Sequence, residues 1–263
     1  MLFRSKIKTD HLNVRSFKVY ADGALGSRGA LLKAPYDDMQ GHYGLWLSDI
    51  DEINAAAKKI AEHGFQMCTH CIGDSAVYTL LNIYGEYTNA ITDARWRIEH
   101  CQVVSPEDFV LYKKYKVIPS VQPTHATSDM YWAKDRIGNE RIKGAYAYRQ
   151  LMEQNNMLAA GSDFPVEDIN PLYGFYAAVV RKDKSNFPPG GFQVENAISR
   201  EQALKAMTIW AAYSNFEEQE KGSLEKGKFA DFVITSEDLL TTPDSLLWKI
   251  KVEATFVNGE KVF

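Results

Sequence analysis

The chain has 263 residues, of which 45% are hydrophobic and 24% charged, and this balance is ordinary for a globular protein with one large domain or a domain and a small appendage. Its net charge of −4 is spread without long runs of one sign, which argues against nucleic acid or a membrane surface as the partner and favours a small molecule. The sequence has neither a membrane-length apolar stretch nor a signal-peptide pattern, and its 3 cysteines give no disulfide framework, so we expect a cytoplasmic protein.

The first predicted strand covers residues 16–23 and places Lys18 on the same face as a tyrosine and an aspartate. A lysine in an apolar strand is costly to bury unless it is paired, modified or bound to a ligand. A loop rich in glycine and proline covers residues 23–44 and is long enough to cover a site. A helix is predicted next over residues 48–64, with Ser48 as its cap.

The same unit of strand, polar residue, loop and helix then recurs along the chain. A short apolar run ends in His70, and a glycine then turns the chain so that Asp74 can cap the next helix. A serine–proline pair likewise predicts the start of the helix after the following strand. The predicted strands of this series are residues 66–71, residues 95–104 with His100 near their end, residues 117–123 leading Gln122 and His125 into a polar loop, and, after a helix at 140–154, residues 157–165 with Asp163 near their end.

After residue 165 two more helices are followed by a change to short strands. The second helix carries the capping box Ser199-x-x-Gln202, and Asn258-Gly259 in the tail is a strong hairpin turn. This change predicts two domains, a strand–helix domain at residues 1–215 and a small β piece at residues 216–263. The segments are helices at 171–181 and 199–214 and strands at 222–228, 230–234 and 254–263.

Strands that alternate with helices call for a parallel sheet, because each return to the sheet needs a crossover. Polar residues recur at the C-terminal ends of these strands, where barrels place their sites, so a (β/α) barrel is favoured over an open sheet. Only five of the eight strands of such a barrel are present. The predicted fold is therefore an incomplete TIM-type barrel of the α/β class, whose two raw sheet edges must be paired or covered.

Four side chains from different predicted strands, Lys18, His70, His100 and Asp163, occupy equivalent positions near the strand ends. Folding of successive strand–helix units would bring the four side chains together at the C-terminal edge of the sheet. A cluster of nitrogen and carboxylate ligands of this kind suits zinc or a similar divalent ion. Taken singly, a histidine on an apolar strand is more often a hydrogen-bonded core residue, a lysine a salt-bridge partner, and an aspartate before a helix a cap. All four in register predict a metal site.

Two other kinds of site use the same residues. The segment Cys68-Thr69-His70-Cys71 contains a C-x-x-C, which occurs in redox pairs and in half of a zinc knuckle. A knuckle needs a second ligand pair and only Cys101 remains, while strand alternation turns Cys68 and Cys71 to opposite faces. A cysteine–histidine nucleophile pair is the other alternative, but neighbours in a strand point apart and no third orienting group is evident.

Six blocks of the sequence carry a resemblance to a known family. Together they resemble the amidohydrolase superfamily, in particular its YtcJ-like branch of metal-dependent hydrolases (amidohydrolase family 3), which has relatives that act on N-substituted formamides and similar amides. The resemblance implies a (β/α)8 barrel with a small β-sandwich assembled from both chain ends. In chain order the blocks are FKVYADGALGSRGA, THCIGDSAV, RIEHCQVV, SVQPTHA, GSDFPVEDINPL and GSLEKGKFADFVI.

The resemblance also implies roles for the four side chains. Lys18 resembles the strand-four lysine that is carboxylated to bridge two metals, which converts a buried cation into an anionic oxygen ligand. His70 and His100 resemble the ligands of strands five and six, and Asp163 resembles the strand-eight aspartate. The family begins its site with a His-x-His after the first strand, and this sequence contains none. The chain therefore resembles the C-terminal portion of the family, with strands four to eight and part of the β-sandwich.

This resemblance predicts metal-dependent hydrolysis of a carbon–nitrogen bond in a small amide-type substrate, with one or two divalent ions, for which zinc is the expected metal. Asp163 is the expected catalytic residue, which takes a proton from a metal-activated water. Arg28, Gln122, His125 and Arg181 are candidate substrate contacts.

A non-catalytic half-barrel is the alternative from a different class of protein. The absent His-x-His and the raw sheet edges motivate it. It predicts a truncated chain that persists as a homo-oligomer or needs a complementing N-terminal segment.

Overall fold

Residues 5–263 are described by the structure, a computed structural model. The chain divides into two compact units, Met1–Ser120 with Trp132–Ala147, and Val121–Tyr131 with Tyr148–Phe263. The predicted boundary after residue 215 lies inside the second unit. The first four residues of the predicted first domain lie outside the described residues.

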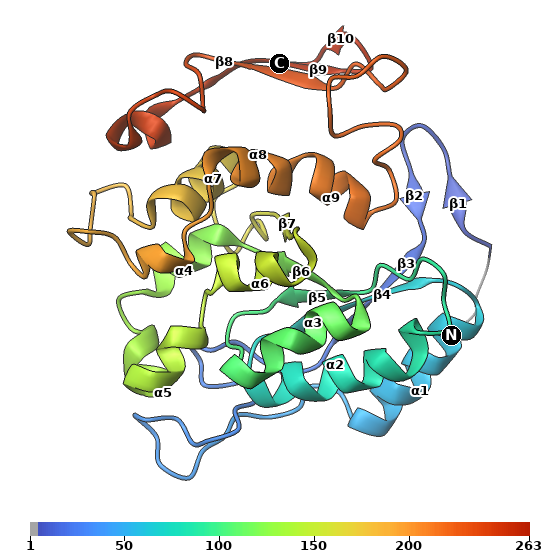
Figure 1. Ribbon diagram of the computed structural model, residues 1–263, viewed down its shortest axis with the longest axis vertical. Coiled ribbons are helices and arrows are strands. Elements are labelled where there is room, and N and C mark those ends of the chain that lie inside the picture. Colours follow the sequence, from blue (N-terminus) through green and yellow to red (C-terminus); the bar gives the residue numbers. More distant parts are fainter. Residues whose placement is uncertain (1–4) are drawn as a thin grey trace. The chain divides into compact units, whose positions relative to one another are not determined.

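The first unit is built on parallel strands that lie side by side in the order β3, β4, β5 and β6 (Figure 1). Strands that are consecutive in the chain and parallel in the sheet need a crossover, which explains the helices between them. A short antiparallel ribbon, β1 with β2, precedes the sheet. The elements are β1 (Ile7–Lys8), β2 (Asn13–Val14), β3 (Ser16–Tyr20), α1 (Ile50–Glu62), β4 (Gln66–Cys71), α2 (Asp74–Thr88), β5 (Arg97–His100), η1 (Pro106–Asp108), α3 (Phe109–Tyr115), β6 (Ile118–Val121), α5 (Ala133–Arg141) and η2 (Ile142–Gly144).

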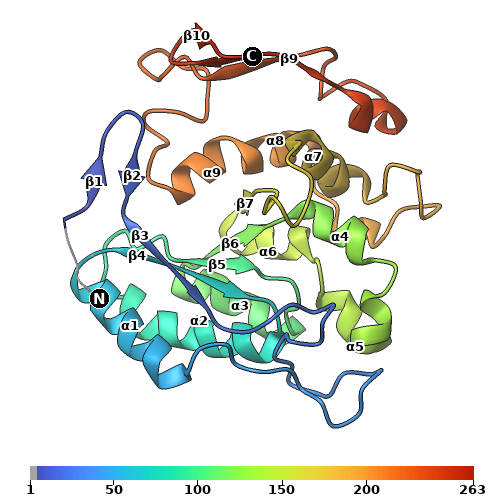
Figure 2. The same ribbon diagram turned by 180° about the vertical axis from the view of Figure 1, so that it is seen from behind.

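Helices α1, α2 and α3 lie on one face of this sheet (Figures 1 and 2). The core beneath them includes the fully buried Trp96, whose ring meets that of Tyr84 edge to face with the ring centres 4.8 Å apart. The Trp96 Nε1–H donates to the Phe65 carbonyl at 3.0 Å. A buried indole therefore has its one polar group satisfied while its ring fills the space between helix and sheet.

Two predicted helix caps are displaced by one residue. Asp49, and not Ser48, caps α1 with its side chain. Gly73, with an extended backbone, occupies the cap position of α2, and the helix begins at Asp74. The Asp74 carboxylate accepts a hydrogen bond from the Lys33 N–H at 2.9 Å. Asp74 thus ties the start of α2 to the long loop that follows β3.

This long loop, residues 23–44, is bound to the rest of the first unit by hydrogen bonds and by a buried side chain. The Leu31 carbonyl accepts hydrogen bonds from the Ser75 and Ala76 N–H groups at 3.2 and 3.4 Å, at the start of α2. Tyr36 is fully buried and its hydroxyl donates to the Ala30 carbonyl at 2.8 Å. The loop is therefore a packed segment of its unit.

The second unit begins at Val121, the last residue of β6, whose carbonyl accepts a hydrogen bond from the Gly161 N–H at 3.0 Å, just beyond β7. Where the sequence predicts a polar loop after β6, helix α4 begins at once, and Pro123 at its first position favours that start. The predicted strand at 157–165 is reduced to two residues. The elements are α4 (Pro123–Asp129), α6 (Tyr148–Asn155), β7 (Ala159–Ala160), α7 (Pro171–Val180), η3 (Val194–Asn196), α8 (Arg200–Met207), α9 (Ile209–Ser214), β8 (Phe232–Thr235), η4 (Asp244–Lys249), β9 (Val252–Val257) and β10 (Glu260–Lys261).

Two predicted helices are each divided. The prediction at 140–154 fails because Tyr146, between η2 and α6, has a left-handed φ of 52°, which an α-helix of L-residues does not continue. The prediction at 199–214 is divided at Thr208, where φ is −127° and ψ is −96°, so that α8 and α9 are separate helices.

Two local sequence signals are confirmed. The Ser199 side chain accepts a hydrogen bond from the Gln202 N–H at 3.2 Å, and the Gln202 side chain accepts one from the Ser199 N–H at 2.8 Å. Asn258 and Gly259 have φ values of 50° and 82° and turn β9 into β10 within the antiparallel sheet β10-β9-β8. The predicted strand at 222–228 forms turns and bends instead, because its glycines have positive φ. No helix in the described part of the chain is both long and apolar enough to cross a membrane.

Candidate active site

One face of β3 and β4 carries both Lys18 and His70. Lys18 pairs with Cys68 in register, so His70 lies two residues farther along β4 on the same face. Tyr20 contacts both side chains: its ring centre is 5.5 Å from the Lys18 Nζ and 5.2 Å from the centre of the His70 ring. The structure therefore brings Lys18 and His70 to one patch of the sheet.

His100 reaches this patch by a departure from regular strand geometry. His70 pairs with Glu99, whereas His100 pairs with Cys71, so alternation would turn His100 to the opposite face. The His100 backbone is left-handed, with a φ of 79°, and its ring meets the His70 ring edge to face with the centres 4.4 Å apart. The predicted equivalence of His70 and His100 in register is thus wrong, although the two imidazoles do come together.

A left-handed backbone at a residue other than glycine costs of order 1 kcal/mol or more. Such strain persists where the surrounding structure imposes it, often at functional sites. His100 and Asp163, with φ values of 79° and 59°, are both in this class. They share this conformation with several other described residues, among them Tyr146 and Arg181, so the surrounding structure imposes it at site and non-site positions alike.

Asp22 is a fully buried carboxylate next to His70. Its Oδ1 accepts a hydrogen bond from the Ile72 N–H at 2.9 Å, and its Oδ2 accepts two, from the Leu31 N–H at 2.9 Å and the Gly73 N–H at 2.8 Å. Its Oδ1 also lies 4.0 Å from the His70 Nε2. Asp22 thus joins the long loop, the β4–α2 turn and His70. In the sequence, Asp22 ends a predicted strand and precedes Gly23, and His70, His100 and Asp163 also lie near the ends of predicted strands. This shared position is the sequence feature that could have identified Asp22 as a site residue.

Burial raises the pKa of Asp22 to about 6 from its ordinary value of 3.8, against the opposing effect of the backbone N–H donors. Between about pH 4 and 6 the folded protein therefore binds more protons than the unfolded chain, and the free energy of unfolding falls as the pH rises, by roughly 3 kcal/mol from this group. We expect the free energy of unfolding of the Asp22→Asn variant to lack this decrease with pH. Denaturant titration of the variant and of the unmodified protein between about pH 4 and 6 measures it.

The comparison of the two proteins isolates Asp22, because carboxylates with a lowered pKa, such as Asp38, contribute equally to both. The free energy of unfolding of Asp22→Asn should rise relative to that of the unmodified protein as the pH increases. A difference that stays constant across the window would contradict the raised pKa.

An ion pair between the half-buried Arg97 and the buried Glu99, not predicted from the sequence, lies on the same sheet face as His70. The Arg97 Nε–H donates to the Glu99 Oε1 at 2.9 Å. Burial works to raise the pKa of Glu99, but Arg97, together with a Ser120 hydrogen bond and the Lys18 charge, outweighs burial and holds the pKa below its usual value. An anionic carboxylate therefore lies on this face of the sheet, on the residue that pairs with His70.

Asp163 belongs to the second unit and is the third residue after β7. The alternative role of a helix cap does not apply, because α7 begins only at Pro171 and Asn170 caps it. Asp163 is exposed, and its own carbonyl accepts a hydrogen bond from the Val166 N–H at 2.9 Å. Its convergence with the residues of the first unit stays a prediction.

Arg28, a predicted substrate contact, forms a two-contact ion pair within the first unit. Its Nε and one terminal nitrogen lie 3.0 and 2.9 Å from the two carboxylate oxygens of Asp38. These hydrogen bonds raise the pKa of Arg28, and Asp38 binds Arg136 as well. The guanidinium thus has a structural partner, and its contact with a substrate stays a prediction.

The other predicted substrate contacts, Gln122, His125 and Arg181, lie in the second unit. Gln122 is buried at the start of α4, and the His125 Nε2 lies 3.9 Å from the Glu167 Oε1. Arg181 is fully buried, and its Nε–H donates to the Phe192 carbonyl at 2.8 Å. Each has contacts inside its unit, so a role toward a substrate stays a prediction for all three.

Within residues 5–263 no group of three or more histidine, cysteine, aspartate or glutamate side chains gathers closely enough to hold a metal. The first unit does offer two imidazoles in contact, with a buried carboxylate beside one of them. Imidazole is a common ligand of zinc, and carboxylates commonly orient such ligands from behind. The residues present therefore fit a divalent ion through His70 and His100, and Lys18 would add a ligand only as an anionic carbamate.

Nearly the whole chain matches a known family. The profile of the Amidohydrolase family matches residues 3–263. The chain is similar to the Putative amidohydrolase YtcJ of Bacillus subtilis (strain 168), with 30% identity over 260 residues that cover 98% of this chain and 49% of that protein. It is also similar to Protein LONG AFTER FAR-RED 3 of Arabidopsis thaliana, with 34% identity over 268 residues that cover 100% of this chain and 45% of that protein. The chain thus spans about half the length of these curated relatives.

The fold is shared with solved structures. The crystal structure of an uncharacterized metal-dependent hydrolase from Pyrococcus horikoshii OT3 matches with a TM-score of 0.81 and 29% sequence identity, over 91% of this chain and 48% of that chain. This likeness confirms the predicted α/β class, an incomplete (β/α) barrel with a small antiparallel sheet. From the profile and the identity to its relatives, the chain belongs to the amidohydrolase family.

Proposed function

We propose that this chain carries part of the active site of a metal-dependent hydrolase that cleaves a carbon–nitrogen bond in a small amide-type molecule. The observation that carries the proposal is the contact between the His70 and His100 rings at the C-terminal ends of β4 and β5. In (β/α) barrels this rim is where catalytic groups gather, and neutral imidazole is the commonest metal ligand. Membership of the amidohydrolase family supports the class of reaction.

The metal of this proposal is zinc. A divalent ion supplies polarisation of a carbonyl group and lowers the pKa of a water from 15.7 to about 7. His70 and His100 would hold it as neutral imidazoles, with Asp22 positioned to orient His70. Lys18 would add an anionic oxygen after carboxylation of its amine.

Asp163 is the proposed general base. Its carboxylate caps no helix and is exposed, so it is available to accept a proton from the attacking water. The same group would then return the proton to the leaving nitrogen, because an amine leaves far more readily than its anion.

Removal of the metal tests this proposal directly. We expect elemental analysis of the purified chain to find one or two zinc ions. Because the chain carries only part of the active site, its release of amine from small N-substituted formamides should be weak or absent, and any release should fall to background after dialysis against a chelator. Addition of zinc should restore it. Hydrolysis that survives chelation would contradict the role of the metal, and a purified chain that binds no zinc would contradict the site.

A further inference from the structure

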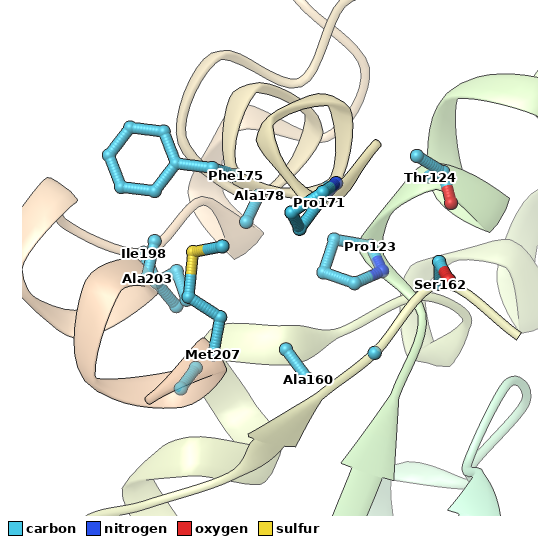
Figure 3. A pocket seen from close by; sticks show the side chains of 13 residues that line it. Pro123, Thr124, Ala160, Ser162, Pro171, Phe175, Ala178, Ile198, Ala203 and Met207 are labelled. Atoms are coloured by element: carbon cyan, nitrogen blue, oxygen red, sulfur yellow. The ribbon is translucent and has the colours of Figure 1, made fainter. Parts of the chain in front are cut away.

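A cavity and a larger cleft of the second unit share Thr124 in their walls. The cavity has a volume of about 70 Å³, lies between β7, α7, α8 and the start of α4, and has an almost wholly apolar wall (Figure 3). It would take small apolar molecules without distinguishing them, so it identifies no ligand. The cleft, of about 320 Å³, is lined by α4, by α7 and by the segments on both sides of α7. Its volume lies within the range of about 300–1,000 Å³ that is usual for small-molecule sites.

This α4–α7 cleft carries more negative than positive side chains. Three carboxylates line it, those of Glu167, Asp168 and Asp183. They face the ammonium groups of two lysines in the same wall, Lys182 and Lys184. The balance of charge therefore favours a cationic ligand over an anionic one.

The carboxylate of Glu167 contributes to this balance without a lysine or arginine of its own. Its side chain is 18% exposed, and among the described residues it forms an ion pair only with a histidine, His125, whose Nε2 lies 3.9 Å from its Oε1. The Ser128 hydroxyl donates to the same oxygen at 2.6 Å. A largely buried carboxylate is costly unless a cation accompanies it, so Glu167 favours a positively charged group in the cleft.

One ammonium group already lies against the wall of the cleft. The Lys184 Nζ is 3.5 Å from the centre of the Tyr173 ring and 3.8 Å from the Asp168 Oδ2. The face of a tyrosine ring attracts cations, and aromatic rings are used in this way to recognise alkylated ammonium ligands. The side chains of Lys184 and Asp168 are 51% and 49% exposed, and an ion pair this exposed contributes little to stability. The ring and the carboxylate thus form an ammonium site from which Lys184 can be displaced.

We propose that the α4–α7 cleft binds a small alkylammonium ion. Its cationic head takes the place of the Lys184 ammonium on the Tyr173 ring, beside the Asp168 carboxylate. Glu167 adds a second negative charge to the same wall. The hydrocarbon part of the ligand has the ring of Tyr131 to contact, which also lines the cleft and is 58% exposed.

The test is a titration of the full chain with butylammonium chloride, followed by the NMR signals of labelled tyrosine rings. We expect a saturable shift of the Tyr173 and Tyr131 signals. Butanol has the same hydrocarbon without the charge, and butyrate has the opposite charge, so both should bind more weakly by about fivefold or more.

Two lysine variants separate the contact with the ring from the general effect of charge. Lys184→Ala removes the competing ammonium and should tighten the binding of butylammonium about fivefold. Lys182→Ala is the matched control, because it removes the same charge from the same cleft while the ammonium on the Tyr173 ring stays in place. At physiological salt it should change the affinity by no more than about twofold.

The ring itself is tested at Tyr173. Tyr173→Leu should weaken binding about fivefold, followed through the Tyr131 signals, whereas Tyr173→Phe keeps a ring and should bind as the unmodified protein does. The fully enclosed ring of Tyr148, in α6 and 2% exposed, reports whether each variant folds. If Tyr173→Leu does not fold, Asp168→Asn replaces it and should weaken binding about threefold.

Equal affinities for butylammonium in Lys184→Ala and Lys182→Ala would overturn the proposal, and so would the absence of a saturable shift in Lys184→Ala. Butyrate that binds as tightly as butylammonium would overturn the choice of a cation. Binding is measured without turnover, so its outcome is independent of the hydrolysis proposed above.

Discussion

Replacing either His70 or His100 with alanine should lower the affinity of the protein for zinc by more than about 100-fold. The loss of a residue that merely orients a metal ligand already costs 10–100-fold in affinity, and here a proposed ligand itself is removed. The fold should survive, because the edge-to-face contact of the two rings contributes only about 1 kcal/mol beyond its buried area. Competition for zinc against a coloured chelator measures the affinity, and the amide assay follows activity in parallel.

The control for this experiment is His11→Ala, since His11 is exposed and lies outside the patch. It should bind zinc as the unmodified protein does. The double variant of His70 and His100 should be little worse than either single variant, because both side chains act on one ion and their effects are not additive. Unchanged zinc affinity in all of these folded variants would show that the two rings only pack against each other.

Gly73→Ala should destabilise the protein by about 3 kcal/mol or more. A Cβ at this position would lie 2.1 Å from the carbonyl oxygen of Leu31, which is backbone and cannot rotate away. That same oxygen accepts hydrogen bonds from the Ser75 and Ala76 N–H groups, and the Gly73 N–H donates to the Asp22 Oδ2 at 2.8 Å. Moving Leu31 aside would therefore break several buried hydrogen bonds at once, which places this substitution among the severe ones.

Denaturant titration of Gly73→Ala gives the change in the free energy of unfolding. The matched control is Gly174→Ala within α7, where the added Cβ would be 3.9 Å from its nearest neighbour, the Cδ of Pro123. Alanine is the better helix former by about 1 kcal/mol, so the control should be as stable as the unmodified protein or more so. A Gly73→Ala variant as stable as this control would refute the close approach of Leu31 to the β4–α2 turn.

Several features of the fold could be predicted because they depend on a few consecutive residues. Each strand–helix–strand segment indicates two parallel strands, because the helix is the crossover between them, and this holds independently of the other segments. The capping box of Ser199 with Gln202 and the turn at Asn258-Gly259 are local in the same sense, and both are confirmed. The predictions that failed, such as the single helix at 140–154, are those in which one residue, Tyr146, takes a left-handed backbone that its own sequence does not signal.

For the candidate site as well, some features could be predicted from the sequence and others only from the tertiary structure. The sequence by itself indicated that histidines lie near the ends of two successive predicted strands and that Asp22 and Asp163 lie near the ends of two others. Only the tertiary structure decided that the left-handed turn at His100 brings its ring onto that of His70, and that Asp22 is buried against the Gly73 N–H, 51 residues away in the chain. The physical reason is that burial and hydrogen bonding of a polar group are set by distant segments packed around it, and these neighbours are defined only once the chain has folded.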